Sequence, residues 1–388
     1  MNDMWERLHR WWEAGTPCGL ATVVSAYGSA PRRPGALMIC APDGTVTGSV
    51  SGGCVEGAVY DLAQQAVRDG VPVLERYAVS DDDAGAVGLT CGGTIQVFVE
   101  RIDRRSFPEL GLLVERMRAG DAVALATVVE PHGSVPAGAH LVHWSGGTTG
   151  STGDPAVDAE AAGVAGRLLA QGGSSHVFRT GSGDASPGAA PRVFVNCLAP
   201  PPRMLVYGAT EFASALTRQG ALLGFRVTVC DARPVFTTPE RFPDADEVVV
   251  DWPHRHLAAE AAAGRIDHST VVVSLTHDPK FDVPLLQTAL RMDLAYVGAL
   301  GSRRTAGRRR ASLRAAGVRN DRLARLCSPA GLDLGGADPA ETALSIASEI
   351  LLRRHSGTGD RLSATEGAIH RTSPAPGDIR FAAGRSER

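Results

Sequence analysis

An internal duplication in the first half of the chain constrains the fold more than any other feature. The segment ATVVSAYGSAPRRPGALMI, which begins at Ala21, recurs in degenerate form as ATVVEPHGSVPAGAHLV. Further along each copy, GSV at Gly48 corresponds to GST at Gly150, and QVFVE at Gln96 corresponds to RVFVN at Arg192. Sequence that recurs in this order predicts one supersecondary unit built twice and packed as a pseudo-symmetric pair.

The order of elements within each copy follows from its composition. A β-branched strand, a Gly/Pro turn, a second strand, a Gly-rich turn, a helix and a last strand succeed one another. Asp61–Val67 and Ala159–Gln171 have the composition of helices. We therefore expect a duplicated α+β domain over residues 16–196, with repeats at about 16–100 and 121–196.

The pattern changes after Cys197–Arg203, a Pro-rich segment that predicts a linker. Short apolar runs then alternate with helical segments. The expected strands are Met204–Tyr207, Phe225–Cys230, Glu247–Val250, Thr270–Leu275 and Leu294–Val297, and the expected helices are Glu211–Leu223, Val283–Arg291 and Thr305–Ala316. This alternation predicts a Rossmann-like, doubly wound parallel-sheet domain over residues 203–354.

The last helix of that domain has a well-marked start. Asp338 is placed to cap it, Pro339 suits the first helical position, and Glu341 can reach back to complete a capping box. We expect this helix to continue to about Arg354. Ser, Gly, Arg and Pro dominate from Ser356 onward, which predicts a disordered tail over 356–388.

Charge and hydropathy argue against two broad classes of protein. With 39 basic and 42 acidic residues, the chain lacks the basic surplus of nucleic-acid-binding proteins. No segment approaches the ~18 consecutive apolar residues of a membrane helix, and the N-terminus lacks an apolar signal core. We expect a cytoplasmic protein that binds neither nucleic acid nor membrane. Lys280 is the only lysine and no G-x-x-x-x-G-K-[ST] motif occurs, which excludes a P-loop ATPase.

Two cysteines of the first copy have glycine neighbours. They are Cys54 in SGGCVEG and Cys91 in LTCGG, and Glu56 lies beside the first. Glycines let a ligand approach the backbone, and a thiol there can bind a soft metal or carry sulfur. The second copy has no equivalent cysteine, so we expect one thiol site, with both sulfurs close in space. The alternative is that each is a small buried apolar residue, as a lone cysteine usually is.

The segment LVYGATEFA occupies the place of a dinucleotide-binding turn. It follows an expected strand at Gly208, and Asp231 ends the next strand, where such an acid usually binds ribose hydroxyls. Thr210 and Glu211 stand where a pyrophosphate would need to approach the backbone. The alternative is a Rossmann-like scaffold with weak or altered nucleotide binding.

A second anion-binding candidate is the segment YVGALGSRRTAGRRR. Gly298 and Gly301 follow an expected strand, Ser302 is placed as a helix cap, and Arg303 lies in the first turn. Free backbone amides and a guanidinium together suit a phosphate group. We expect Arg308–Arg310 to form a solvated helix face instead.

The segment THDPKFD gathers charge after another expected strand. His277, Asp278, Lys280 and Asp282 lie at the carboxyl end of that strand, where doubly wound sheets bind ligands. We expect them to face a cleft between the domains, near Ser302. The alternative is a capped helix start with solvated charges.

Taken together, the motifs resemble a known family. GSAPRRPGALM, SGGCVEG, LTCGG, LVYGATEFA, VCDARPVF, RFPDADEVV, HDPKFD, YVGALGSRR and GLDLGGADPAETALSIASEI occur in the order typical of the XdhC/CoxI family, over roughly residues 16–354. The family's usual Rossmann turn reads GAGHVA, whereas this chain has GATEFA.

The resemblance implies an accessory protein for molybdenum hydroxylases such as xanthine dehydrogenase and carbon monoxide dehydrogenase. It implies binding of the molybdenum cofactor, as molybdopterin or its dinucleotide form, and its insertion into the apo-enzyme. Sulfuration by a cysteine desulfurase is implied as well. On this interpretation the protein is a cofactor chaperone rather than a catalyst, tight NAD(P) binding is not expected, and a homodimer stays open.

In that chaperone the C-terminal domain would hold the cofactor phosphate, and Cys54 and Cys91 would meet the molybdenum or a transferred sulfur. Two rival hypotheses come from other classes. A nicotinamide-dependent oxidoreductase requires tight NAD(P) binding, which a turn with the single glycine Gly208 disfavours. A docking scaffold would bind protein partners and no cofactor.

Overall fold

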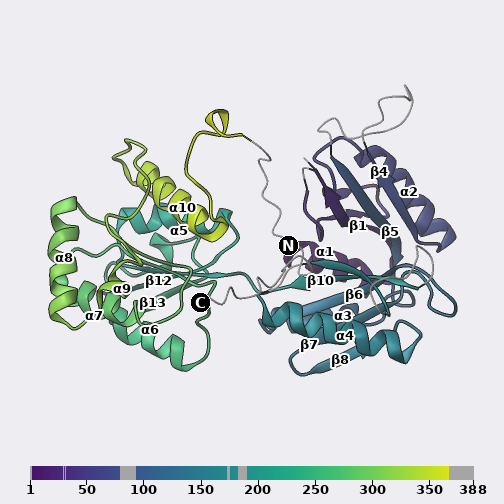
Figure 1. Ribbon diagram of the computed structural model, residues 1–388, viewed down its shortest axis with the longest axis horizontal. Helices are drawn as coiled ribbons and strands as arrows, with labels where there is room; N and C mark the ends of the chain where they lie inside the picture. The colour runs from purple at the N-terminus through teal and green to yellow at the C-terminus, as the bar shows by residue number, and fades with distance from the viewer. Residues whose placement is uncertain are drawn as a thin grey trace, which may run out of the picture. The chain divides into compact units, whose positions relative to one another are not determined.

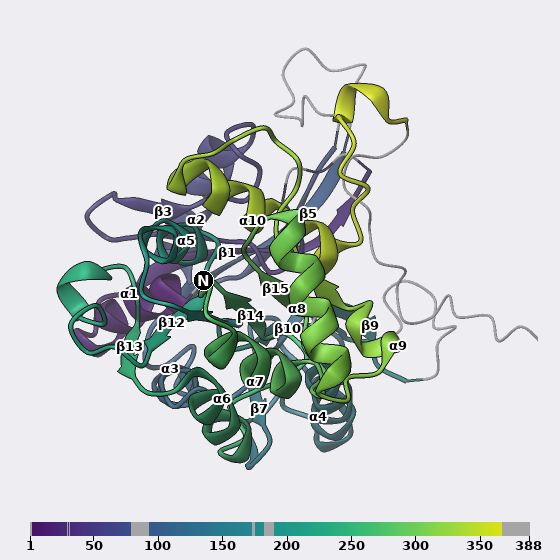
Figure 2. The same ribbon diagram turned by 90° about the vertical axis from the view of Figure 1, so that its left-hand side faces the viewer.

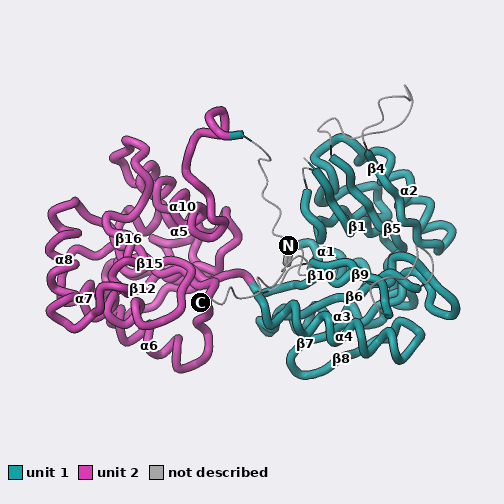
Figure 3. Tube along the Cα trace, in the orientation of Figure 1, with its two compact units in different colours: residues 1–200, 366–388 teal, residues 201–365 magenta. Residues whose placement is uncertain are grey.

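The chain folds into two compact units, which are described separately below (Figure 3). The computed structural model describes residues 2–28, 30, 32–78, 93–172, 175–181 and 190–366. The first unit reaches Pro200 and the second spans Pro201–Thr365. The division falls inside the Pro-rich segment that the sequence marks as a linker.

The first unit contains two antiparallel sheets with the same strand order. The first sheet is ordered β3-β2-β1-β5-β4 and the second β8-β7-β6-β10-β9. The strands are β1 (Cys18–Tyr27), β2 (Leu37–Cys40), β3 (Val46–Gly48), β4 (Val73–Tyr77), β5 (Thr94–Ile102), β6 (Val123–Glu130), β7 (His140–Trp144), β8 (Gly147–Gly150), β9 (His176–Arg179) and β10 (Arg192–Leu198). The predicted duplication is thus present in the fold. The short strands β3 and β4, and their counterparts β8 and β9, were not among the expected elements.

One helix covers a face of each sheet. Helix α2 (Glu56–Asp69) packs Val59 and Ala63 onto the first sheet, and α4 (Pro155–Ala170) packs Ala161 and Ala165 onto the second. Both helices begin earlier than their apolar composition indicates, because polar turns start them. Helices α1 (Asn2–Glu13) and α3 (Leu110–Arg118) pack together over residues from both sheets.

Equivalent residues of the two copies meet between the sheets. Val24 and Phe98 of the first copy pack against Val129 and Phe194 of the second in one buried cluster. Beside it, buried Glu100 of β5 brings Oε2 within 3.0 Å of Nε2 of buried His140 on β7. The residue equivalent to Glu100 in the second copy is Asn196, whose Oδ1 accepts a hydrogen bond from Ser175 Oγ at 2.8 Å.

The second unit is built on a six-stranded sheet in the order β13-β12-β11-β14-β15-β16. Its strands are β11 (Arg203–Tyr207), β12 (Arg226–Asp231), β13 (Glu247–Val250), β14 (Val271–Ser274), β15 (Tyr296–Ala299) and β16 (Leu326–Cys327), and every adjacent pair is parallel. This order, with the reversal between β11 and β14, is that of a doubly wound nucleotide-binding fold. The predicted fold class is confirmed.

Helices cover both faces of the parallel sheet, as Figures 1 and 2 show. Alternate residues of β11 divide between the two cores, Met204 and Val206 on one face and Leu205 and Tyr207 on the other. Helices α5 (Glu211–Leu222) and α10 (Pro339–His355) pack on the first face. Helices α6 (Pro253–Ala262), α7 (Pro279–Ala289), α8 (Arg303–Ala315) and the short α9 (Asn320–Leu323) pack on the second.

Most helices and strands begin and end close to the predicted residues. The start of a helix differs from the prediction where a capping residue lies earlier in the sequence. Asp338 caps α10 by accepting from the amide of Glu341 at 2.9 Å, as predicted. Helix α7 instead begins at Pro279, four residues before the predicted start at Val283, because Asp278 caps it. Short 3-10 turns occur at Pro239–Arg241 and Leu362–Ala364, and of the predicted tail only the part up to residue 366 is described.

Candidate functional site

The turn that carries Cys54 is organised by one carboxylate. Glu56, the first residue of α2, accepts hydrogen bonds from Ser49 Oγ at 2.7 Å and from Ser51 Oγ at 2.5 Å. It also accepts from the backbone amides of Ser51, Gly52 and Gly53 at 2.8–3.0 Å. The carboxylate therefore gathers the N–H groups of the turn around itself.

These bonds fix the role of Glu56. Burial would raise its pKa, but the hydrogen bonds from Ser51, Ser49 and the backbone outweigh burial and lower the pKa to about 2. A carboxylate that is fully ionised and saturated with donors is a poor proton acceptor. Glu56 holds the turn, and its assignment to a cofactor site stays a prediction.

The glycines give this turn a shape that other residues would strain. Gly52 and Gly53 have φ values of +83° and +123°, in the region that favours glycine. A Cβ on either would meet none of the described residues within 4 Å. Cys54 follows, half-buried, against the same core cluster as Val55 and Tyr77.

The second copy keeps the carboxylate and one serine of this turn, but it lacks the two adjacent glycines and the cysteine. GSVSGGCVE from Gly48 aligns without a gap with GSTGDPAVD from Gly150, so Asp158 replaces Glu56 and Ala156 replaces Cys54. Asp158 accepts from Ser151 Oγ at 2.7 Å and from the Thr152 amide at 2.6 Å. The fold thus requires the acid in both copies, whereas the Gly-Gly-Cys sequence is particular to the first.

The remaining cysteines divide by burial. Cys91 lies outside the described residues, so its closeness to Cys54 stays a prediction. Burial raises the pKa of Cys18 and Cys230 to about 12, and of Cys40 and Cys327 to about 11. Among the described residues, no group of three or more His, Cys, Asp or Glu could hold a metal ion.

In the second unit, the strand ends bring the other predicted segments to one edge of the sheet. Tyr207 pairs with Cys230 and with Ser274, and Ser274 pairs with Ala299. The residues that follow these strands therefore share the carboxyl edge, where ligands bind in such sheets. Gly208, Asp231, the 276–282 segment and the 300–304 segment all lie there.

The Gly208 turn is closed by its own chain. Gly208 has φ +113°, and a Cβ on it would lie 3.0 Å from the backbone of Leu275 and Thr276. Its amide donates to Cys230 O at 2.9 Å, the Ala209 amide to Asp231 Oδ2 at 2.8 Å, and the Thr210 amide to Gly208 O at 3.0 Å. The amides that a pyrophosphate would use already have partners.

Asp231 is likewise saturated. Arg233 donates from Nε to Oδ1 at 2.9 Å and from Nη2 to Oδ2 at 2.7 Å, and its backbone amide donates to Oδ1 at 2.9 Å. Burial would raise the pKa of Asp231, but these bonds and the one from Ala209 lower it. The sequence analysis missed Arg233, although the Asp-x-Arg spacing in VCDARPVF is a signal for such a pair.

The THDPKFD segment combines a capped helix start with two exposed basic side chains. His277 and Lys280 are exposed, and Asp278 caps α7 by accepting from the Lys280 amide at 3.0 Å. Lys280 Nζ lies 3.1 Å from Asp278 Oδ2, so the carboxylate also pairs with the lysine. Asp282 differs, since it is buried and accepts from Ser274 Oγ and Thr276 Oγ1.

In the YVGALGSRR segment, Ser302 caps a helix, whereas Gly298 belongs to a buried strand. Ser302 caps α8 by accepting from the Thr305 amide at 3.2 Å, and Arg303 is exposed in a first turn that contains no acidic residue. Gly301, at φ +147°, precedes the cap. Gly298 lies within β15, where a Cβ would come within 2.4 Å of the Tyr296 ring, so packing accounts for that glycine.

One expectation about this helix is wrong. Arg309 was expected on a solvated face, yet it is buried and donates twice to Asp282 Oδ2, at 2.7 and 3.1 Å. It also donates to Leu300 O at 2.9 Å and to Ser328 Oγ at 2.9 Å. Arg309 thereby ties α7, α8 and the segments after β15 and β16 together. Its run of arginine neighbours concealed it in the sequence.

Two family descriptions match most of the chain. The description "XdhC and CoxI family" matches residues 11–78 and 116–189, and "XdhC Rossmann domain" matches residues 204–350. The chain belongs to the XdhC and CoxI family. The Cys54 turn and the carboxyl edge of the parallel sheet both lie within the matched residues.

Relatives of this XdhC-family chain carry informative names. It is 28% identical over 340 residues to a Bacillus subtilis (strain 168) protein named as a probable subunit of xanthine dehydrogenase, covering 86% of this chain and 92% of the relative. It is 25% identical over 337 residues to PaoD of Escherichia coli (strain K12), named a molybdenum cofactor insertion chaperone, covering 87% and 83%.

A crystal structure shows the same fold. A protein described as a xanthine dehydrogenase from Bacillus halodurans superposes with a TM-score of 0.71 at 25% identity, over 94% of this chain and 97% of that one. No helix among the described residues is both long and apolar enough to span a membrane.

Proposed function

We propose that this protein binds the molybdenum cofactor and inserts it into a molybdenum hydroxylase of the xanthine dehydrogenase or carbon monoxide dehydrogenase type. The proposal includes help with sulfuration of the cofactor by a cysteine desulfurase, before insertion, in the cytoplasm. Family membership supports it, as do two relatives, one named as part of a xanthine dehydrogenase and the other as a molybdenum cofactor insertion chaperone.

The observation that carries the proposal is the difference between the two copies at Cys54. Both copies keep the Ser–acid clamp that builds the turn, whereas only the first adds two left-handed glycines and a thiol. Because the second copy builds the same turn without this side chain, we infer that the Cys54 thiol serves the cofactor rather than the fold. A thiol suits molybdenum, whose dithiolene sulfur ligands already make it soft.

The second unit offers groups for the phosphate end of the cofactor. Lys280 and Arg303 are exposed cations at the carboxyl edge, and Ser302 lies next to Arg303 at the α8 N-terminus. Positive charge beside a helix N-terminus favours an anionic ligand. These groups would hold the phosphate or nucleotide while Cys54, with Cys91, faces the metal.

The experiment is cofactor retention by the full chain made in a host that synthesises the molybdenum cofactor. Bound molybdenum and pterin are measured for the wild type, for Cys54→Ala and for Cys197→Ala, a half-buried cysteine of the second copy. We expect Cys54→Ala to lose at least about tenfold of the metal and Cys197→Ala to keep it. Equal retention by Cys54→Ala would contradict a role for this thiol, and a wild type without metal and pterin would contradict the function.

A nicotinamide-dependent oxidoreductase is the second candidate, because the strand order of the sheet is that of dinucleotide-binding folds. The amides of Gly208–Thr210 are already bonded, and Glu211 is exposed at the start of α5. Repulsion between Glu211 and a pyrophosphate ~4 Å away costs roughly 1–4 kcal/mol. We expect calorimetry to detect no micromolar binding of NAD(H) or NADP(H), and such binding would favour the oxidoreductase.

A further inference from the structure

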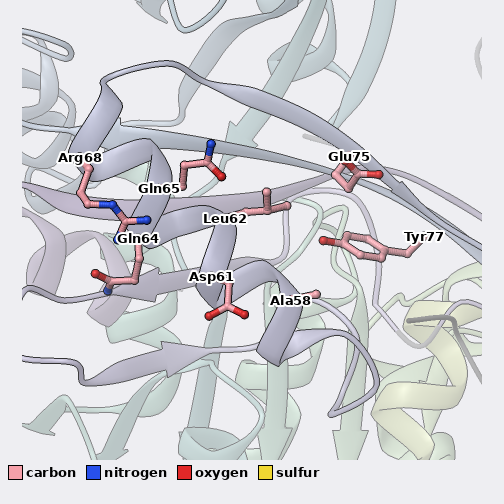
Figure 4. Close-up of a pocket in the computed structure, with 8 residues that line it drawn as sticks. All are labelled: Ala58, Asp61, Leu62, Gln64, Gln65, Arg68, Glu75 and Tyr77. Carbon is pink, nitrogen blue, oxygen red and sulfur yellow. The ribbon is translucent and has the colours of Figure 1, made fainter. Parts of the chain in front are cut away.

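A pocket of about 660 Å³ lies beside α2, within the first unit (Figure 4). It opens between one face of that helix and the edge strand β4. The lining residues are Ala58, Asp61, Leu62, Gln64, Gln65 and Arg68 from α2, with Glu75 and Tyr77 from β4. Ala58 is four residues after Cys54 in the sequence, in the first turn of α2.

Tyr77 brings an unused hydroxyl to this pocket. Its side chain is 6% exposed, and its Oη has no hydrogen-bond partner among the described residues. Figure 4 shows the ring reaching from β4 with the hydroxyl directed toward Leu62 and Asp61 of α2. Burial, and then the charge of Glu75, raise the pKa of Tyr77 to about 12, so the hydroxyl remains a donor. A buried donor without a partner is costly unless a ligand supplies one.

The other polar side chains can meet a flat heterocycle edge-on. The carboxylates of Asp61 and Glu75 come from the two walls of the pocket, and Gln64 and Gln65 add amides. Ala58 and Leu62, both half-buried, give an apolar surface between them. A carboxylate accepts two parallel N–H bonds from an amino-pyrimidine edge, and a hydroxyl serves a neighbouring ring acceptor.

The second copy again serves as an internal comparison. Continuing the gap-free alignment along the helices places Gly163 at the position of Asp61 and Gly166 at that of Gln64. The strand registers place Phe178 at the position of Glu75, since Glu75 pairs with Val97 and Phe178 with the equivalent Val193. The carboxylates of Asp61 and Glu75 therefore accompany the Gly-Gly-Cys turn, whereas the second copy has Gly163 and Phe178 at their positions and instead has Glu160 and Arg167 at those of Ala58 and Gln65.

We propose that the α2–β4 pocket recognises the amino-oxopyrimidine edge of a pterin ring, through the Asp61 and Glu75 carboxylates and the Tyr77 hydroxyl. This pterin site rests on the proposed function, and it adds that the first unit binds the pterin part of the cofactor. A pterin held there has its far side directed along α2 toward Cys54, so edge recognition and the thiol act on one bound molecule. Guanine presents the same edge, so the test separates the two heterocycles.

The test measures binding of free pterin, which carries neither metal nor phosphate, to the full chain purified without cofactor. Fluorescence titration compares the wild type with Glu75→Gln, Tyr77→Phe and Cys54→Ala. We expect affinity to fall at least ~10-fold for Glu75→Gln, which loses a charged acceptor, and ~2- to 10-fold for Tyr77→Phe. Cys54→Ala should bind pterin like the wild type. Asp69→Asn and Tyr60→Phe, on the same helix outside the lining, are the matched controls.

The melting temperature supplies an independent readout. Because the buried Tyr77 hydroxyl has no hydrogen-bond partner among the described residues, Tyr77→Phe should keep the melting temperature or raise it by ~2–4 °C, although it weakens pterin binding. A structural role would instead lower it. No binding by the wild type at millimolar pterin, unchanged affinity in both pocket variants, or guanosine bound as tightly as pterin would each overturn the proposal. Metal retention independent of Cys54, with pterin binding intact, would overturn only the thiol role.

Discussion

At the scale of single residues, acidic side chains that the sequence suggests as functional often stabilise the fold instead. Glu56 was a candidate because it lies beside a thiol, and the structure shows it saturated by the turn that it organises. Asp231 and Asp282 are similar, each held by an arginine. What sequence spacing cannot reveal is whether an acid has spare acceptor capacity, because that depends on donors brought in by the fold.

Glu56→Gln should destabilise the first unit. The lowered pKa of Glu56 means that its ionised form is favoured in the folded state, and this stabilisation is complete above the unfolded value of 4.5. It is lost as the pH falls from 4.5 toward about 2. Because the side chain is partly exposed, we expect a loss of about 1–3 kcal/mol in urea denaturation at pH 7.

The control for this prediction is built into the chain. Asp158→Asn removes the equivalent acid of the second copy, whose pKa is also lowered, and should destabilise to a similar degree. Only Glu56→Gln should also impair molybdenum retention, since only its turn carries a cysteine. A Glu56→Gln protein as stable at pH 7 as the wild type would show that the turn holds without the carboxylate.

Thiol reactivity should separate Cys54 from the buried cysteines. A raised pKa leaves little thiolate, so Cys18, Cys40, Cys230 and Cys327 should react with iodoacetamide at pH 8 at least ~100-fold more slowly than an ordinary cysteine. Half-buried Cys54 should react faster than these. Peptide mass spectrometry of a time course gives the order, and rapid labelling of Cys18 or Cys40 would contradict it.

The same reagent class tests the predicted pairing of thiols. If Cys54 and Cys91 share a site, a short bifunctional thiol reagent should link them within one chain at native pH. Digestion followed by mass spectrometry identifies the linked peptides, with Cys54→Ala as the blank. Separate modification of the two cysteines, with no linked product, would reject a shared site.

At the scale of elements, sequence patterns located strands and helices well and located their ends less well. The predicted bounds of β11 and β13 agree with the structure to within one residue, because a short β-branched apolar run between helical segments is typical of a buried strand. The start of α7 was missed because Pro284 suggests a helix start nearby, whereas Asp278 provides the cap a turn earlier. The short edge strands β4 and β9 carry charged residues and gave no strand signal.

Helix α8 is joined to α7 by a bond that can be tested. Arg309→Gln should destabilise the second unit by about 3–5 kcal/mol, because it leaves the Asp282 carboxylate buried without its cation. Arg308→Gln, one residue earlier on the exposed face, should change stability by less than ~0.5 kcal/mol. Chemical denaturation of the two variants checks this, and equal small effects would show that the pair contributes nothing.

At the scale of the whole molecule, the repeat and the strand–helix alternation were sufficient to predict a duplicated α+β unit and a doubly wound parallel-sheet unit, but not the four short strands β3, β4, β8 and β9. Topology followed because a duplicated sequence must give duplicated sheets, and alternation permits few parallel-sheet orders. The pocket lined by Tyr77 and Glu75 could not be predicted, since its walls come from a helix and a strand that are joined only by the register of the sheet.

The two units are proposed to share one ligand, and the exposed cations test the part assigned to the second. Lys280→Ala and Arg303→Ala should each reduce cofactor retention several-fold. The Lys280–Asp278 pair is exposed, so melting temperatures should hardly change. Arg304→Ala, which also lies exposed in the first turn of α8, shows whether position matters beyond charge. Unchanged retention in both variants would remove this edge from the site.

The buried contact between Glu100 and His140 has a consequence for how the chain sorts its strands. Strands β5 and β10 share the sequence VFV and pair with strands that both contain ATVV, so nothing in those segments tells one sheet from the other. A chain that exchanged them would bury Glu100 opposite the Gly35–Leu37 segment, where Asn196 now lies, and leave His140 facing an amide. Burying the Glu100 carboxylate without His140 costs several kcal/mol. The Glu100–His140 pair therefore favours the observed pairing of these two nearly identical strands over the exchanged pairing during folding.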